Sequence, residues 1–160
     1  MLRILKYKWA KNEDKLRESL SKLDTSEYIE YRQLVKLTFD VIFNSDGGVR
    51  NNGILDVDKI TVVDDGEYQG CQLFLIPFDT YQPDETEYLM TYQDYGSCSG
   101  CDTLQNILMY CDKNPSGNEL NRLLDLCRDL IMRTIKPYTG SWYGQEGDFD
   151  QIDIDERKIE

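Results

Sequence analysis

A pair of cysteines in a short loop is the feature of the sequence most suited to chemistry. The loop reads DYGSCSGCD over residues 94–102 and places Cys98 and Cys101 at C-x-x-C spacing. It follows an expected strand and precedes an expected helix, so the dipole of that helix would favour thiolates. A C-x-x-C pair at a helix start is typical of a dithiol redox centre. The expected order of elements differs, however, from the βαβ start of thioredoxin-like domains.

The same two cysteines also suit a zinc site, which needs four soft ligands. Cys71, on an expected central strand, is the remaining candidate for a third ligand, with Asp94 or Asp102 as the fourth. Cys111 lies too far along the expected helix to take part, and Cys127 falls on an apolar helix face, where cysteine commonly serves as a small hydrophobe. A single C-x-x-C without a second pair is a weak zinc signal. Zinc is therefore an alternative to a protein without a cofactor.

A structural interpretation of the loop needs no ligand. Gly96 and Gly100 would let the chain turn tightly, Asp102 would cap the following helix, and the small cysteines would pack beneath that helix. Anion binding is not favoured, because the loop has no Lys or Arg nearby and lacks the G-x-x-x-x-G-K-S/T pattern. A phosphatase arrangement also fails, since the residue six positions after Cys98 is Leu104 instead of arginine.

The chain contains no histidine among its 160 residues. This excludes Ser-His and Cys-His nucleophile pairs, imidazole general bases and histidine-ligated zinc. Acid–base chemistry would fall to carboxylates such as Asp56 and Asp58, or Asp148 and Asp150. With 30 acidic residues in the chain, however, close carboxylate pairs arise by chance. The sequence therefore favours a binding protein over an enzyme.

Negative charge is concentrated in one part of the chain. The formal net charge is −12, and the stretch between Lys59 and Lys113 holds ten acidic residues and no Lys or Arg. Residues 1–24 instead carry seven basic and four acidic residues, whereas residues 148–160 carry six acidic and two basic ones. Direct binding to nucleic acid is not expected, because that affinity comes mainly from Lys and Arg.

The acidic stretch also holds six tyrosines, and aromatic anchors among carboxylates suit a protein-binding surface. We expect this surface to imitate the phosphates of DNA and to occupy the basic, nucleic-acid-binding surface of a partner protein such as a nuclease. A solvated face that only aids solubility is the alternative. The expected partner-binding residues are Asp79, Tyr81, Asp84, Glu85, Glu87, Tyr88, Asp148, Asp150, Asp153 and Asp155.

The hydrophobic pattern predicts the elements that position these residues. Alternation of Leu5, Tyr7 and Trp9 with lysines predicts a strand over residues 2–9. A helix capped by Asn12 is expected next. A second helix is expected to start at a cap on Asp24, with Tyr28, Tyr31, Val35, Phe39 and Ile42 on its buried face.

The rest of the chain is expected to form three strands and two helices. The strands are predicted over residues 59–63, 71–78 and 87–93, and the helices begin after caps at Asp102 and Ser116. This βααβββαα order predicts one α+β domain over residues 1–147, with a small, mainly antiparallel sheet packed with helices. Residues 148–160 are expected to form an acidic C-terminal segment.

The sequence favours a cytoplasmic location and no membrane partner. The first six residues are interrupted by charge and lack the apolar stretch of a secretory signal. No stretch approaches the roughly 18 apolar residues that a membrane span requires. Five cysteines, an odd number, fit a reducing compartment better than a disulfide framework.

The stretch DYGSCSGCDTLQ, residues 94–105, resembles a signature of small acidic proteins encoded by tailed bacteriophages and prophages. In those proteins the signature precedes a short helix and then a Leu-rich helix that ends near an aromatic residue. Here the resemblance extends from about Gln93 to Tyr138. It transfers no activity and no catalytic residue. It implies a phage-borne protein of the host cytoplasm that binds and inhibits, or redirects, a host nucleic-acid-handling or defence protein.

Overall fold

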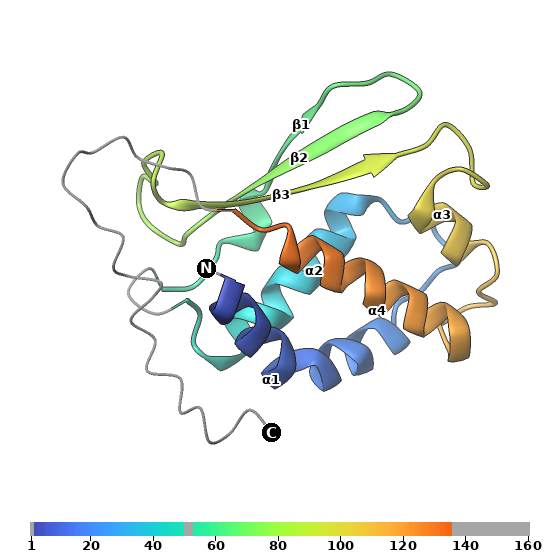
Figure 1. Ribbon diagram of the computed structural model, residues 1–160, viewed down its shortest axis with the longest axis horizontal. Coiled ribbons are helices and arrows are strands. Elements are labelled where there is room, and N and C mark those ends of the chain that lie inside the picture. The colour runs from blue at the N-terminus through green and yellow to red at the C-terminus, as the bar shows by residue number, and fades with distance from the viewer. Residues whose placement is uncertain (1, 50–52, 136–160) are drawn as a thin grey trace.

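Helices cover one face of a three-stranded antiparallel sheet (Figure 1). A computed structural model describes residues 2–49 and 53–135. The order of the main elements is ααβββαα, which confirms the predicted α+β class but differs from it at the first element. The elements are α1 (Leu2–Ser21), α2 (Tyr31–Phe43), β1 (Thr61–Asp64), β2 (Gly70–Pro77), β3 (Tyr88–Tyr95), α3 (Thr103–Leu108) and α4 (Gly117–Met132), with short 3-10 turns at Asn44–Asp46 and Val57–Lys59.

The three strands lie where the sequence predicted them, to within about two residues. β2 is central and pairs antiparallel with both neighbours. In the ladder Phe74 lies between Val62 and Thr91, and Phe74 and Thr91 are fully buried under the helices. The hydroxyl of Thr91 donates to the carbonyl oxygen of Leu130 at 2.6 Å, which fixes β3 to α4.

The predicted strand over residues 2–9 is wrong, because these residues form the first turns of α1. The buried positions include Leu5, Trp9, Leu16 and Leu20, a helical spacing of four or seven. Alternation placed Lys8 on a solvent-exposed face, but Lys8 is buried. Its ammonium donates hydrogen bonds to the carboxylate of Asp46 and to the carbonyl oxygen of Gly48.

Asn12 and Asp24 do not cap the helices that were predicted to begin at them. Asn12 lies fully buried in the middle of α1, and its amide donates to the carbonyl oxygen of Ile42 at 3.1 Å. The carboxylate of Asp24 instead accepts from the backbone N–H of Ser26 at 3.0 Å, which forms a local turn. The second helix therefore begins later, at Tyr31.

α2 begins with a reciprocal cap that the prediction missed. The Gln33 side chain accepts from the backbone N–H of Glu30 at 2.7 Å, as in a capping box. Because the helix starts at Tyr31, Tyr28 lies outside it with 72% of its surface exposed instead of on the buried face. Tyr31, Val35, Phe39 and Ile42 are buried as predicted.

The last two helices begin where they were predicted, α3 after Asp102 and α4 after Ser116. α3 is only six residues long and ends before Cys111. Apolar side chains from α1, α2, β2, β3, α3 and α4 join in one hydrophobic core. The predicted end of the domain at residue 147 and the acidic segment over 148–160 lie outside the described residues.

Candidate functional site

The C-x-x-C loop is closed by the carboxylate of Asp102. Its oxygens accept from the backbone N–H of Gln105 at 2.8 Å and from that of Gly96 at 3.2 Å. Gly96 permits this closure, since a Cβ there would lie 2.6 Å from the carbonyl carbon of Cys101. Asp102 is 4% exposed and caps α3, which confirms its predicted structural role.

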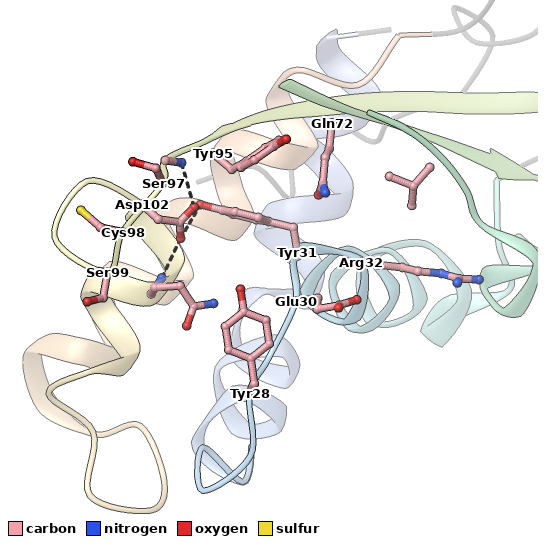
Figure 2. A pocket seen from close by; sticks show the side chains of 13 residues that line it. Tyr28, Glu30, Tyr31, Arg32, Gln72, Tyr95, Ser97, Cys98, Ser99 and Asp102 are labelled. Carbon is pink, nitrogen blue, oxygen red and sulfur yellow. Dashed lines mark hydrogen bonds between the residues drawn. The ribbon is translucent and has the colours of Figure 1, made fainter. Parts of the chain in front are cut away.

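Tyr31 joins this loop to the start of α2, as Figure 2 shows. Its hydroxyl donates to Asp102 at 3.4 Å and accepts from the backbone N–H of Leu104 at 3.0 Å. The Gln105 side chain adds a hydrogen bond to the carbonyl oxygen of Ile29 at 2.8 Å. Burial, together with the charge of Asp102, raises the pKa of Tyr31 well above its usual range. The loop is therefore held by residues more than 70 positions away in the sequence.

The two cysteines lie side by side on the surface. Their Sγ atoms are 2.7 Å apart, and both residues are exposed. The backbone N–H of Cys98 donates to Sγ of Cys101 at 3.0 Å, and the N–H groups of Cys101 and Asp102 both donate to the carbonyl oxygen of Cys98. The hydrogen bond with the Cys98 side chain, followed by that with Ser97, lowers the pKa of Cys101.

These positions correct two expectations about the loop. The cysteines do not pack beneath α3, because Asp102 occupies the buried position and leaves both sulfurs outside. Gly96 is required as predicted, whereas a Cβ at Gly100 would meet only Sγ of Cys98 at 3.9 Å, so the turn does not require glycine there.

Cys71 does not join Cys98 and Cys101 as the zinc alternative required. It lies opposite Asp94 in the β2–β3 ladder, and burial, followed by Asp94, raises its pKa. Within residues 2–49 and 53–135, no three His, Cys, Asp or Glu side chains are grouped so that they could hold a metal ion.

A hollow of about 630 Å³ lies beside the loop (Figure 2). Its wall combines Tyr28 from the segment before α2, Arg32 from the first turn of α2, Tyr95 at the end of β3, and Cys98. Sequence reasoning missed Tyr28 and Arg32, because only the fold brings them beside the loop. The Glu30–Gln33 capping pattern is the signal that would have placed the start of α2 correctly.

Five of the predicted partner-binding residues lie in the β2–β3 connection, at one end of the sheet, and a sixth, Tyr88, is the first residue of β3 (Figure 1). Asp79, Tyr81, Asp84 and Glu85 are exposed, with Tyr81 at 97%, whereas Glu87 and Tyr88 are half-buried. The other four, Asp148, Asp150, Asp153 and Asp155, lie outside the described residues.

Two of these acidic residues shape the connection itself. Asp84 accepts from the backbone N–H and the hydroxyl of Thr86, and these bonds lower its pKa. Glu87 accepts from the backbone N–H of Asp84 at 3.1 Å. Asp79 and Glu85 accept no hydrogen bond within the described part of the chain. The charge of Asp79, after Asp56, helps to raise the pKa of Lys59.

A second acidic cluster lies at the opposite end of the sheet, in the β1–β2 turn (Figure 1). Asp64 accepts from the Tyr95 hydroxyl at 2.7 Å, which raises the pKa of Tyr95 to about 12, and Asp65 accepts from the N–H of Cys71. Glu67 and Tyr68 are exposed beside them. The eight residues of β2 separate the two ends by about 23 Å at about 3.3 Å per residue.

The ion pairs of the described residues all lie outside the cation-free stretch. They join Lys8 and Lys11 to Asp46, Lys22 to Glu18, Lys36 to Asp58, Lys59 to Asp56, and Arg128 to Asp125. The carboxylates of residues 60–112 therefore have no ion-pair partner within residues 2–49 and 53–135. Four of them, Asp64, Asp65, Asp84 and Glu87, instead accept hydrogen bonds from the chain, and Asp102 is buried.

We compared the chain with known proteins and found no relative. No family model, no curated protein and no solved structure matches the chain. In the described part of the chain, no helix combines the length and apolar character needed to cross a membrane.

Proposed function

We propose that this protein binds the basic surface of a host protein that handles nucleic acid, such as a nuclease, and inhibits or redirects it. The contact is made by the acidic β2–β3 connection, with Asp79 and Glu85 facing Lys and Arg of the partner and Tyr81 as an aromatic anchor. In this role the carboxylates stand in for the phosphates of DNA. The protein itself binds neither nucleic acid nor a membrane.

The observation that carries this proposal is the separation of charge between the sheet and the helices. Eight of the ten acidic residues of this stretch lie on or beside the sheet, and none forms an ion pair with the described residues, whereas the helices hold their own ion pairs. Uncompensated carboxylates repel one another, and a cationic partner relieves that repulsion. Complementary charge of this kind also accelerates encounter and disfavours wrong partners.

The exposed tyrosines support a protein partner over a purely solvating role. Tyr81 is 97% exposed and Tyr68 is 79% exposed, and each lies beside carboxylates at one end of the sheet. Tyrosine is enriched among residues that carry binding energy, because its ring buries a large area and its hydroxyl can donate a hydrogen bond. A solubilising face has no need of exposed aromatic rings.

The biological setting is part of the same proposal. The DYGSCSGCDTLQ stretch resembles the signature of phage and prophage proteins, which supports a partner in the cytoplasm of a bacterial host. Five cysteines, an odd number, fit a reducing compartment better than a disulfide framework.

A capture experiment tests the proposal. The tagged protein is incubated with a bacterial lysate at low salt, and the retained proteins are identified by mass spectrometry with and without excess duplex DNA. DNA should release the partner, because both ligands use the same basic surface. Retention of the partner in excess DNA would contradict the proposal.

A further inference from the structure

Cys98 and Cys101 form a site that the proposed binding function does not use. We propose that they are a redox-active dithiol that exchanges electrons with small disulfides, with Cys101 as the attacking thiolate and Cys98 as the resolving thiol. The proposal depends on the loop alone, so it stands or fails independently of the acidic surface.

The loop holds the two sulfurs ready to bond. Their separation of 2.7 Å lets a disulfide close with little movement of the backbone. Asp102 fixes both ends of the loop, and the carbonyl oxygen of Cys98 accepts from two backbone N–H groups. A held geometry of this kind favours disulfide closure, because little chain entropy is lost when the bond forms.

The hydrogen bonds assign different roles to the two sulfurs. Sγ of Cys101 accepts from the N–H of Cys98 at 3.0 Å and lies 3.8 Å from the Ser97 hydroxyl. The Cys98 thiol, 2.7 Å away, can donate a third hydrogen bond, and together these groups stabilise a negative charge on Cys101. When protonated, Cys101 instead donates to the carbonyl oxygen of Cys98 at 3.2 Å. The thiolate is the nucleophilic form of cysteine, so Cys101 attacks first.

The exchange has two steps. The Cys101 thiolate attacks one sulfur of a small disulfide, forms a mixed disulfide and releases the other half as a thiolate, which takes a proton from water. Cys98 then loses its proton to water and attacks Sγ of Cys101, which breaks the mixed disulfide and releases the second half as a thiol. Starting from the Cys101 thiolate, the protein loses two electrons and the Cys98 proton. The small disulfide gains the two electrons, and its two halves take up two protons, one replacing the proton that Cys98 gave to water and one supplied by water, to become two thiols.

The other three cysteines provide internal controls. Cys127 is fully buried, and burial raises its pKa to about 12. The pKa of Cys111 is also raised, first by burial and then by the nearby negative charges of Glu119 and Asp112. Burial, followed by the hydrogen bond and charge of Asp94, raises the pKa of Cys71. These thiols should therefore react far more slowly than Cys101.

The test follows the reaction of the whole protein with hydroxyethyl disulfide by intact mass and peptide mapping. This probe is uncharged, so the neighbouring carboxylates do not repel it. The wild type should lose two hydrogens, form the Cys98–Cys101 disulfide and accumulate no mixed adduct. Cys98→Ser should instead retain one mercaptoethanol adduct on Cys101. Cys111→Ser is the matched control and should behave as the wild type.

A second measurement needs no variant. Brief alkylation of the native, reduced protein with iodoacetamide should label Cys101 at least about tenfold faster than Cys111, as expected for a stabilised, exposed thiolate. The proposal is overturned if Cys101 and Cys111 react at similar rates. It is equally overturned if the wild type accumulates the mixed adduct or remains reduced in excess hydroxyethyl disulfide.

Discussion

The hydroxyl of Tyr31 connects the start of α2 to the cap of α3. It lies 3.4 Å from Oδ1 of Asp102 and accepts from the backbone N–H of Leu104 at 3.0 Å. Both bonds are buried, and the loop that carries Cys98 and Cys101 lies between them and solvent. The position of the dithiol therefore depends on a residue of another element.

Replacement of Tyr31 by Phe should destabilise the protein by about 1–3 kcal/mol, because the buried N–H of Leu104 loses its acceptor. Urea unfolding monitored by circular dichroism measures this difference. Tyr110→Phe, at a residue that is 63% exposed, is the control and should change stability little. Equal stability of Tyr31→Phe and the wild type would show that the hydrogen bond contributes nothing.

Gly96→Ala should destabilise the loop by about 1–3 kcal/mol, because its Cβ would lie 2.6 Å from the carbonyl carbon of Cys101. Disulfide closure between Cys98 and Cys101 should also become less favourable, which a titration with reduced and oxidised dithiothreitol measures. Gly100→Ala is a matched control, since its Cβ would meet only Sγ of Cys98 at 3.9 Å. Identical behaviour of the two variants would contradict a tightly closed loop.

Asp46 should make stability depend on pH. Burial alone would raise its pKa, but the hydrogen bonds from Lys8 and Lys11 and the charge of Lys8 lower it below the usual value. A depressed carboxyl pKa stabilises the fold above the unfolded-state value of about 3.9, and this stabilisation is lost as the pH falls through the lower folded-state value.

Asp46→Asn should therefore cost about 3 kcal/mol at pH 7, because the buried ammonium of Lys8 loses its partner charge. Its urea midpoint should fall less than that of the wild type when the pH is lowered from 5 to 2. Asp14→Asn, on the exposed face of α1, serves as the control. If the urea midpoints of the wild type and of Asp46→Asn fall equally as the pH is lowered, the ion pair is not the source of the pH dependence.

We expect the purified protein to hold no stoichiometric metal. Zinc sites need four ligands, and the described residues gather only Cys98 and Cys101. Elemental analysis of protein purified without chelators provides the measurement. About one zinc per chain, lost in Cys98→Ser, would instead assign the cysteine pair to a metal centre.

Local patterns predicted those parts of the fold that depend on neighbouring residues. The β-branched and apolar runs marked all three strands, and the position of Asp102 before Thr103 marked the start of α3. Alternation failed over residues 2–9, because Lys8 is buried by a charge partner, Asp46, 38 positions later. No local pattern signals such a partner.

The candidate sites were predictable to different degrees. The C-x-x-C spacing identified the cysteine pair, but the exposure of its sulfurs depends on Asp102 filling the buried position below them. The hollow beside it was not predictable, since only the fold brings Tyr28 and Arg32 to the same hollow as Tyr95. In the β2–β3 connection, composition could not separate Asp84 and Glu87, which shape the turn, from Asp79 and Glu85.

The central claim is that the acidic β2–β3 connection, and not the net charge, binds the partner. Its most direct test compares Asp79→Lys/Glu85→Lys with Asp14→Lys/Asp129→Lys, whose reversals lie on the exposed faces of α1 and α4. Each variant replaces two acids with two lysines, so the two proteins have the same net charge. Affinity for the captured partner is measured by calorimetry at about 0.1 M and about 1 M salt, where the screening length falls from about 10 Å to about 3 Å.

The proposal predicts that the wild type and the Asp14/Asp129 variant bind alike at low salt and weaken steeply at high salt. The Asp79/Glu85 variant should bind at least about tenfold more weakly at low salt, since each reversal places like charges in contact. Equal affinities of the two variants, or binding by the wild type that does not change with salt, would contradict the account.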